Sequence, residues 1–151
     1  MDKKVKFEII RQFGPSVFKI QIPEEILDKL NNYTEKVIND KKISDQQDHG
    51  RALVGDVAQE IRLDKDFMLE IGWIQFLGSC VSKWIEVETK KKVTKFNLKN
   101  SWIVRQFKNE YNPTHYHSGH ISGAGFLKLP KTFGKHVPVS YTHLRAHETG
   151  Y

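Results

Sequence analysis

Two short stretches near the start of the chain alternate apolar and polar residues. Residues 5–10 and 17–22 place an apolar side chain at nearly every second position. This is the spacing of a β-strand with one buried face, because successive side chains of a strand point to opposite sides. The turn-forming group Gly14-Pro15-Ser16 lies between the two stretches. We therefore predict two short strands joined by a turn.

A helical repeat of apolar residues follows Pro23 and continues to about Asp40. Glu24 and Glu25 lie where the positive end of a helix dipole favours negative charge. The stretch is therefore predicted to form an amphipathic helix. Its apolar positions are Ile26, Leu27, Leu30, Tyr33, Val37 and Ile38.

The middle of the chain is predicted to be a loop followed by a second helix. Residues 41–65 are mostly polar, so we predict at most a short helix or strand there, near residues 57–63. The second helix runs from Asp66 to about Val87, although Gly72 and Gly78 weaken helical structure locally. The apolar positions with helical spacing are Phe67, Met68, Ile71, Ile74, Leu77, Val81, Trp84 and Ile85.

After the lysine run at residues 90–92, the apolar residues change from helical spacing to the alternating spacing of a strand. Trp102, Val104 and Gln106 share one face of a strand predicted over residues 102–107. Residues 121–129 are predicted to continue the sheet, with glycines that mark a bulge or a close backbone approach. Helices that precede a run of strands indicate an α+β fold.

Composition bounds the class of protein. The chain has 151 residues, of which 38% are hydrophobic, and this suits one globular domain. The lone Cys80 excludes an internal disulfide framework, and no run approaches the roughly 18 apolar residues of a membrane span. The polar opening residues are not those of a signal peptide, so we expect a cytoplasmic protein. The net charge of +6 comes from scattered lysines without an aromatic-basic motif, which disfavours nucleic acid as the partner.

Histidines gather in one part of the chain. Four of the seven lie between His115 and His136, and His115, His117 and His120 fall within six residues. On an extended strand, residues i and i+2 point to the same side, so His115 and His117 can present two imidazoles to one divalent metal ion. Histidines near a turn can instead be exposed or hydrogen-bonded to backbone carbonyls. The position after the turn Asn112-Pro113, at the entry to a glycine-bearing strand, favours the metal site.

The surroundings of the histidines resemble a known family. Residues 100–130 read NSWIVRQFKNEYNPTHYHSGHISGAGFLKLP. The pattern of a Trp-bearing strand, a Tyr-Asn-Pro turn, His-x-His, Ser-Gly and a strand ending in Pro resembles the 2-oxoglutarate and Fe(II)-dependent oxygenases of phages and bacteria. It is also distantly similar to prolyl 4-hydroxylase domains. Residues 13–23, FGPSVFKIQIP, resemble the same family's first strand and helix entry.

The resemblance implies an enzyme and its cofactors. Such a dioxygenase uses Fe(II) and decarboxylates 2-oxoglutarate to succinate while it hydroxylates a C–H bond, and the fold does not name the substrate. His115 and His117 are implied as metal ligands, with His117 at the place where relatives have the Asp of His-x-Asp. Tyr111 would line the pocket, and Lys128 would offer a positive charge to 2-oxoglutarate unless it is simply solvated. His120 either completes a set of three histidines or lies outside the ligand set.

The implied architecture is α+β, with N-terminal helices packed on an incomplete double-stranded β-helix, or jelly roll, over residues 1–137. The distal histidine and the basic residue that clasps 2-oxoglutarate in this family lie near the end of the jelly roll, beyond Val137. We expect this chain alone to be inactive and poorly stable, because an incomplete jelly roll exposes strand edges. The expected compartment is the cytoplasm of a bacterial or phage-infected cell.

Three other interpretations stay open. A cupin-type metal protein has the same fold, but its motif places a glutamate four or five residues after His-x-His, where this sequence has none. A non-catalytic phage or host interaction module would keep the fold without turnover. A basic nucleic-acid-binding domain would show binding that weakens steeply as salt rises.

The last residues resemble sequence of another origin. Residues 138–149, PVSYTHLRAHET, are similar throughout to the conceptual translation of a transposon-based sequencing-library adapter. We therefore expect residues 138–151 to be non-native, so that His143 and His147 carry no function. A genuine His-rich C-terminus is the alternative.

Recovering the uninterrupted gene from its source DNA tests the expected architecture. We expect the reading frame to continue past Val137 for about a hundred residues, the length needed to close a jelly roll. The continuation should contain a distal histidine followed by Arg or Lys. A reading frame that truly ends at Tyr151 would remove the cosubstrate site and favour a non-catalytic or oligomeric metal-binding protein.

Overall fold

Helices and strands are mixed along the chain. The computed structural model describes residues 6–11, 14, 16–48, 57–107, 110, 112–113 and 115–129. The elements are β1 (Phe7–Ile10), β2 (Val17–Ile20), α1 (Glu24–Asn39), α2 (Lys41–Gln47), β3 (Gln59–Arg62), α3 (Lys65–Glu70), α4 (Trp73–Thr89) and β4 (Trp102–Arg105). The predicted α+β class is confirmed. Within these ranges, no helix is long and apolar enough to cross a membrane.

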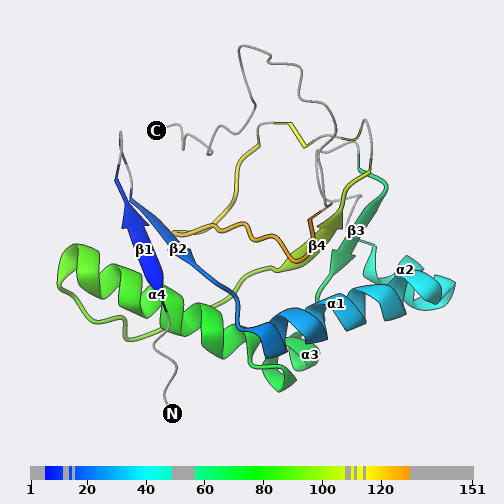
Figure 1. Cartoon of the computed structure of the whole chain (residues 1–151), viewed down its shortest axis with the longest axis horizontal. Coiled ribbons are helices and arrows are strands. Elements are labelled where there is room, and N and C mark those ends of the chain that lie inside the picture. The colour runs from blue at the N-terminus through cyan, green and yellow to red at the C-terminus, as the bar shows by residue number, and fades with distance from the viewer. Residues whose placement is uncertain are drawn as a thin grey trace.

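The described strands form two separate antiparallel ribbons of two strands each. β1 pairs with β2, and β3 pairs with β4 across a connection that contains α3 and α4. Figure 1 shows the helices as a lower layer, with β1 and β2 above α4 and with β3 and β4 above α1. These four strands do not by themselves make a jelly roll, so that part of the predicted fold stays a prediction.

The helix predicted after Pro23 is confirmed as α1, and one residue joins it to α2. Asp40 follows the last turn of α1. Its Oδ1 accepts hydrogen bonds from the backbone N of Lys42 at 3.0 Å and of Ile43 at 3.2 Å, which caps the start of α2. The prediction of a loop from residue 41 was therefore wrong, whereas β3 does fall within the short element predicted near residues 57–63.

The single helix predicted from Asp66 to about Val87 is in fact two helices. Asp64 caps α3, because its Oδ1 accepts hydrogen bonds from the backbone N of Asp66 at 2.9 Å and of Phe67 at 3.0 Å. Gly72 then adopts a left-handed φ of 79°, which ends one helix before the other begins. The prediction failed because the apolar repeat continues across this break, so that side chains on both sides of it pack into the same core.

The hydrophobic core lies where α1, α3 and the strand β4 meet. The buried side chains of this cluster are Leu30, Leu63, Met68 and Ile71. Burying one such side chain contributes roughly 1.5–3 kcal/mol. The partly buried side chains packed against this cluster are Ile26, Tyr33, Phe67, Trp73, Ile74, Leu98, Ile103 and Leu127.

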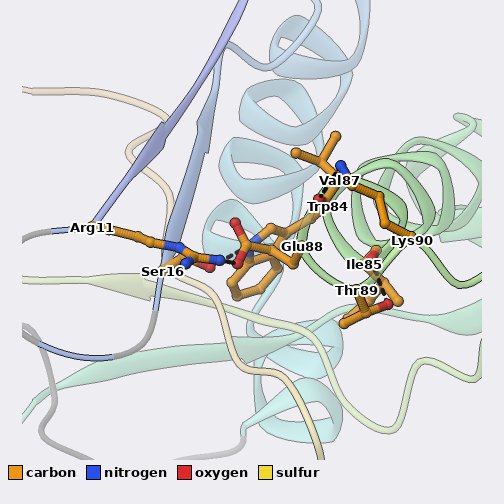
Figure 2. Close-up of polar contacts among 8 residues, drawn as sticks. All are labelled: Arg11, Ser16, Trp84, Ile85, Val87, Glu88, Thr89 and Lys90. Atoms are coloured by element: carbon orange, nitrogen blue, oxygen red, sulfur yellow. Dashed lines mark hydrogen bonds and ion pairs between the residues drawn. The ribbon is translucent and has the colours of Figure 1, made fainter.

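The ribbon of β1 and β2 is attached to α4. Arg11 forms an ion pair with Glu88, and Trp84 Nε1 donates a hydrogen bond to Ser16 Oγ at 2.9 Å, as Figure 2 shows. The Phe18 ring also stacks on the Trp84 ring, with the centroids 6.4 Å apart. A ribbon of two strands is marginally stable alone in water, so α4 supplies the surface that it requires.

Residues 121–129 do not form the strand predicted for them. A methyl group added at Gly125 would lie 3.5 Å from Ile22 Cδ1, and Asn31 Nδ2 donates a hydrogen bond to the Leu127 backbone O at 3.5 Å. The segment thus passes close to the end of β2 and to α1, and Figure 1 shows it crossing between the two ribbons. The prediction was wrong because an extended segment becomes a strand only where another strand offers backbone hydrogen bonds.

Gly72→Ala is expected to destabilise the protein by about 1–2 kcal/mol, because L-residues resist the left-handed conformation found there. The matched control is Gly123→Ala, since Gly123 has no positive φ and open space where a β-carbon would lie. Urea unfolding of both variants measures the difference. Equal free energies of unfolding would show that the break between α3 and α4 does not depend on a left-handed residue.

Candidate functional site

The pairing of β3 with β4 decides which side chains share a face. Ile61 lies opposite Ile103, and Glu60 lies opposite Val104. Opposed residues share a face and successive residues alternate between faces. Ile61 is 4% exposed and Ile103 packs against the core, so these two face the helices. Glu60 and Trp102 therefore belong to the opposite face of the ribbon.

The structure brings the two predicted metal ligands together beside Trp102. The His117 ring stacks on the Trp102 ring, with 5.7 Å between centroids and 24° between planes. The His115 ring lies edge-on to the His117 ring, with 4.6 Å between centroids and 62° between planes. Both imidazoles are thus gathered next to the ribbon face that carries Trp102.

A backbone carbonyl orients the His115 ring. Its Nδ1 lies 2.7 Å from the Pro113 carbonyl oxygen. A carbonyl oxygen only accepts hydrogen bonds, so Nδ1 carries the proton and the lone pair of the neutral ring is on Nε2. Metal-binding histidines almost always donate the other ring N–H to a carbonyl, a carboxylate or water, which fixes their orientation. The His115 ring therefore has the tautomer suited to a metal ligand that binds through Nε2.

Glu60 is buried without a hydrogen bond. It is 2% exposed, and neither of its carboxylate oxygens has a hydrogen-bond partner within the described part of the chain. Burial raises the pKa of Glu60, the negative charge of Asp48 raises this pKa further, and the positive charge of His115 opposes the rise. Asp48 and His115 are thus the two ionisable side chains that affect the pKa of Glu60. A buried carboxylate is unfavourable unless a donor or a cation compensates its charge.

A cavity of about 170 Å³ opens beside β3. It lies between α1, α2 and β3, at the edge of β3 where Asp48 forms a backbone bridge with Ile61. Three of the residues that line it are acidic, namely Asp45, Asp48 and Glu60, so acidic side chains surround this part of the strand. The others are Ile38, Ser44, Ala58, Gln59 and Ile61.

Glu110 fastens the end of the ribbon from which the histidine segment departs. Its Oε1 accepts a hydrogen bond from the Ala58 backbone N at 3.1 Å, just before β3. Its Oε2 accepts one from the Phe107 backbone N at 2.8 Å, just after β4. One carboxylate therefore links both strands, a role that the sequence analysis did not predict.

The other predicted site residues lie apart from the histidine pair or outside the described residues. Lys128 is exposed, with its Nζ 4.0 Å from Glu35 Oε1 on α1, and its contact with 2-oxoglutarate stays a prediction. His120 is also exposed. Tyr111 and residues 138–151 lie outside the described ranges. Among the residues that the structure describes, no three His, Cys, Asp or Glu side chains are grouped closely enough to hold a metal ion.

Glu60 was missing from the predicted site. Its signal in the sequence is a carboxylate placed among the apolar residues Val57, Ile61 and Leu63 of a predicted short strand. That pattern indicates burial, but it does not indicate the partner strand. Only the pairing with β4 brings Glu60 to the face that carries Trp102.

Comparison with known proteins found no matching family model, no matching curated protein and no matching solved structure. The interpretation of the site therefore depends on the chemistry of its side chains. The two adjacent imidazoles supply nitrogen donors of the kind that first-row divalent metals accept.

Glu60→Gln is expected to stabilise the metal-free protein at neutral pH by about 1–3 kcal/mol, because it removes a buried and unpaired negative charge. A raised pKa means that the folded wild type holds this proton more tightly than the unfolded chain. Its stability therefore falls as the pH rises from the ordinary value of 4.5 through the raised pKa. Urea unfolding should show the two proteins converging in acid and the variant more stable at neutral pH. A less stable variant at neutral pH would mean that the Glu60 charge is compensated in the folded protein.

Proposed function

We propose that residues 1–137 are the N-terminal part of an Fe(II)- and 2-oxoglutarate-dependent dioxygenase whose metal is held by His115 and His117. The observation that carries the proposal is the pair of adjacent imidazoles, with 4.6 Å between ring centroids. The hydrogen bond from His115 Nδ1 to the Pro113 carbonyl supports it, because it leaves the lone pair on Nε2. Histidine nitrogens with a carboxylate and open positions are the donor set of non-haem Fe(II) oxygenases.

Each neighbour of the histidine pair has a role in this proposal. The Pro113 carbonyl holds the His115 ring, and the Trp102 ring stacks on His117 and limits its rotation. Bound Fe(II) and 2-oxoglutarate supply the oxidising chemistry, in which decarboxylation of the cosubstrate is coupled to hydroxylation of a C–H bond. Tyr111 and Lys128 are proposed to contact 2-oxoglutarate. Lys128 is available for this because its exposed pairing with a carboxylate of α1 is weak.

The jelly-roll fold is part of the same proposal. The segment over residues 121–129 passes near Ile22 and crosses between the two ribbons, where a strand could join them into one sheet. Phe126 is 71% exposed and Leu129 is 55% exposed, and a second sheet would cover such apolar side chains. We propose that the sequence beyond residue 137 of the natural protein supplies this sheet and that residues 138–151 are non-native.

His115→Ala and His117→Ala are each expected to weaken Co(II) binding by at least about tenfold, which corresponds to about 1.4 kcal/mol of binding free energy. Each variant removes one of the two imidazole donors. Isothermal titration calorimetry gives the affinity, and the visible absorption of Co(II) reports its ligands. His120→Ala is the control, because the proposal places His120 outside the ligand set, so this variant should leave both measurements unchanged.

Failure of the wild-type chain to bind Co(II), or equal binding by the three variants, would contradict the proposed site. Activity then separates the proposed enzyme from the alternatives. The product of the complete gene, loaded with Fe(II), is expected to convert 2-oxoglutarate to succinate. A cupin-type protein or a non-catalytic interaction module would leave 2-oxoglutarate unchanged.

A further inference from the structure

The histidine segment contributes no negative charge to the metal site proposed for it. Non-haem Fe(II) oxygenase sites combine two histidines with one carboxylate and leave other positions open. His115 and His117 supply the two imidazoles, and Tyr116 between them is 89% exposed. A carboxylate ligand must therefore come from another part of the chain.

Glu60 satisfies three conditions for that role. It lies on the face of the ribbon that carries Trp102, the residue on which His117 stacks. It is 98% buried, and its carboxylate has no hydrogen-bond partner among the described residues. On that face Glu60 lies opposite Val104, two residues along β4 from Trp102.

Among the described residues, no hydrogen bond compensates the charge of Glu60. Asp48, although exposed, is a second acidic group that acts on it, and a like charge disfavours the ionised form of a buried carboxyl. Glu110 offers a contrast on the same ribbon, because both of its carboxylate oxygens accept backbone hydrogen bonds. A divalent cation would reverse the unfavourable electrostatics at Glu60, since it is the largest local charge wherever it binds.

We propose that Glu60 is the carboxylate ligand of the metal that His115 and His117 bind. The inference rests on the proposed function and names a ligand from β3, far in sequence from the histidines. Because no three donor side chains of the described residues stand at metal-binding distance, the Glu60 side chain must turn toward the imidazoles when the metal binds. The metal then draws the ribbon and the histidine segment together.

Co(II) titration of the whole 151-residue chain tests this assignment. Glu60→Gln keeps the size of the side chain and removes its charge, and Glu86→Gln is the control on an exposed carboxylate of α4. Glu60→Gln is expected to lower the Co(II) affinity at least about tenfold and to change the Co(II) absorption spectrum, whereas Glu86→Gln should change neither. Unfolding of the metal-free variant, followed by circular dichroism, verifies that lost affinity does not reflect a lost fold.

The histidine variants separate this inference from the proposed function. Weaker Co(II) binding in Glu60→Gln, His115→Ala and His117→Ala alike would support both. Normal binding by Glu60→Gln with weak binding by the histidine variants would overturn the assignment of Glu60 and leave the histidine site standing. Normal binding by all three would overturn both. Weak binding by Glu60→Gln alone would place the cation among the carboxylates of the acidic cavity and would also overturn both.

Discussion

The antiparallel register of β3 against β4 is the constraint on which the core and the candidate site both depend. It places Ile61 and Ile103 against the helices, and it places Glu60 and Trp102 on the other face. A shift of one residue would exchange these two sets and bury a carboxylate in the hydrophobic core. Glu110 opposes such a shift, because its two oxygens bind backbone groups at the ends of both strands. The backbone pairing of β3 with β4 therefore determines both which side chains pack in the core and which side chains face the candidate site.

Elements with strong local signals could be predicted from the sequence. The helix after Pro23 and the strands β1, β2 and β4 follow from the period of their apolar residues. The errors in the predicted helix boundaries each arise from a single residue. Asp40 starts a new helix with its carboxylate, and Gly72 divides an apolar repeat with a left-handed conformation. The spacing of apolar residues does not predict where a single capping side chain starts a helix or where a single left-handed residue ends one.

The site was predictable only where its residues are neighbours in sequence. The spacing of His115 and His117 indicated that their rings could meet, and the rings do lie together. Glu60 could not be placed with them, because its position depends on a strand pairing between distant parts of the chain. The same limitation explains the error over residues 121–129. Alternation shows which side chains are apolar, but it does not identify a partner strand.

The attachment of the first ribbon to α4 has a consequence for biosynthesis. Arg11 and Glu88 are 77 residues apart, and Ser16 and Trp84 are 68 residues apart. On the ribosome, the ribbon is made first but has no surface to dock on until α4 has emerged, because a lone two-stranded ribbon holds little structure. Its phenylalanine side chains stay open to solvent during that interval. The β1–β2 ribbon is therefore accessible to chaperones until α4 has been synthesised.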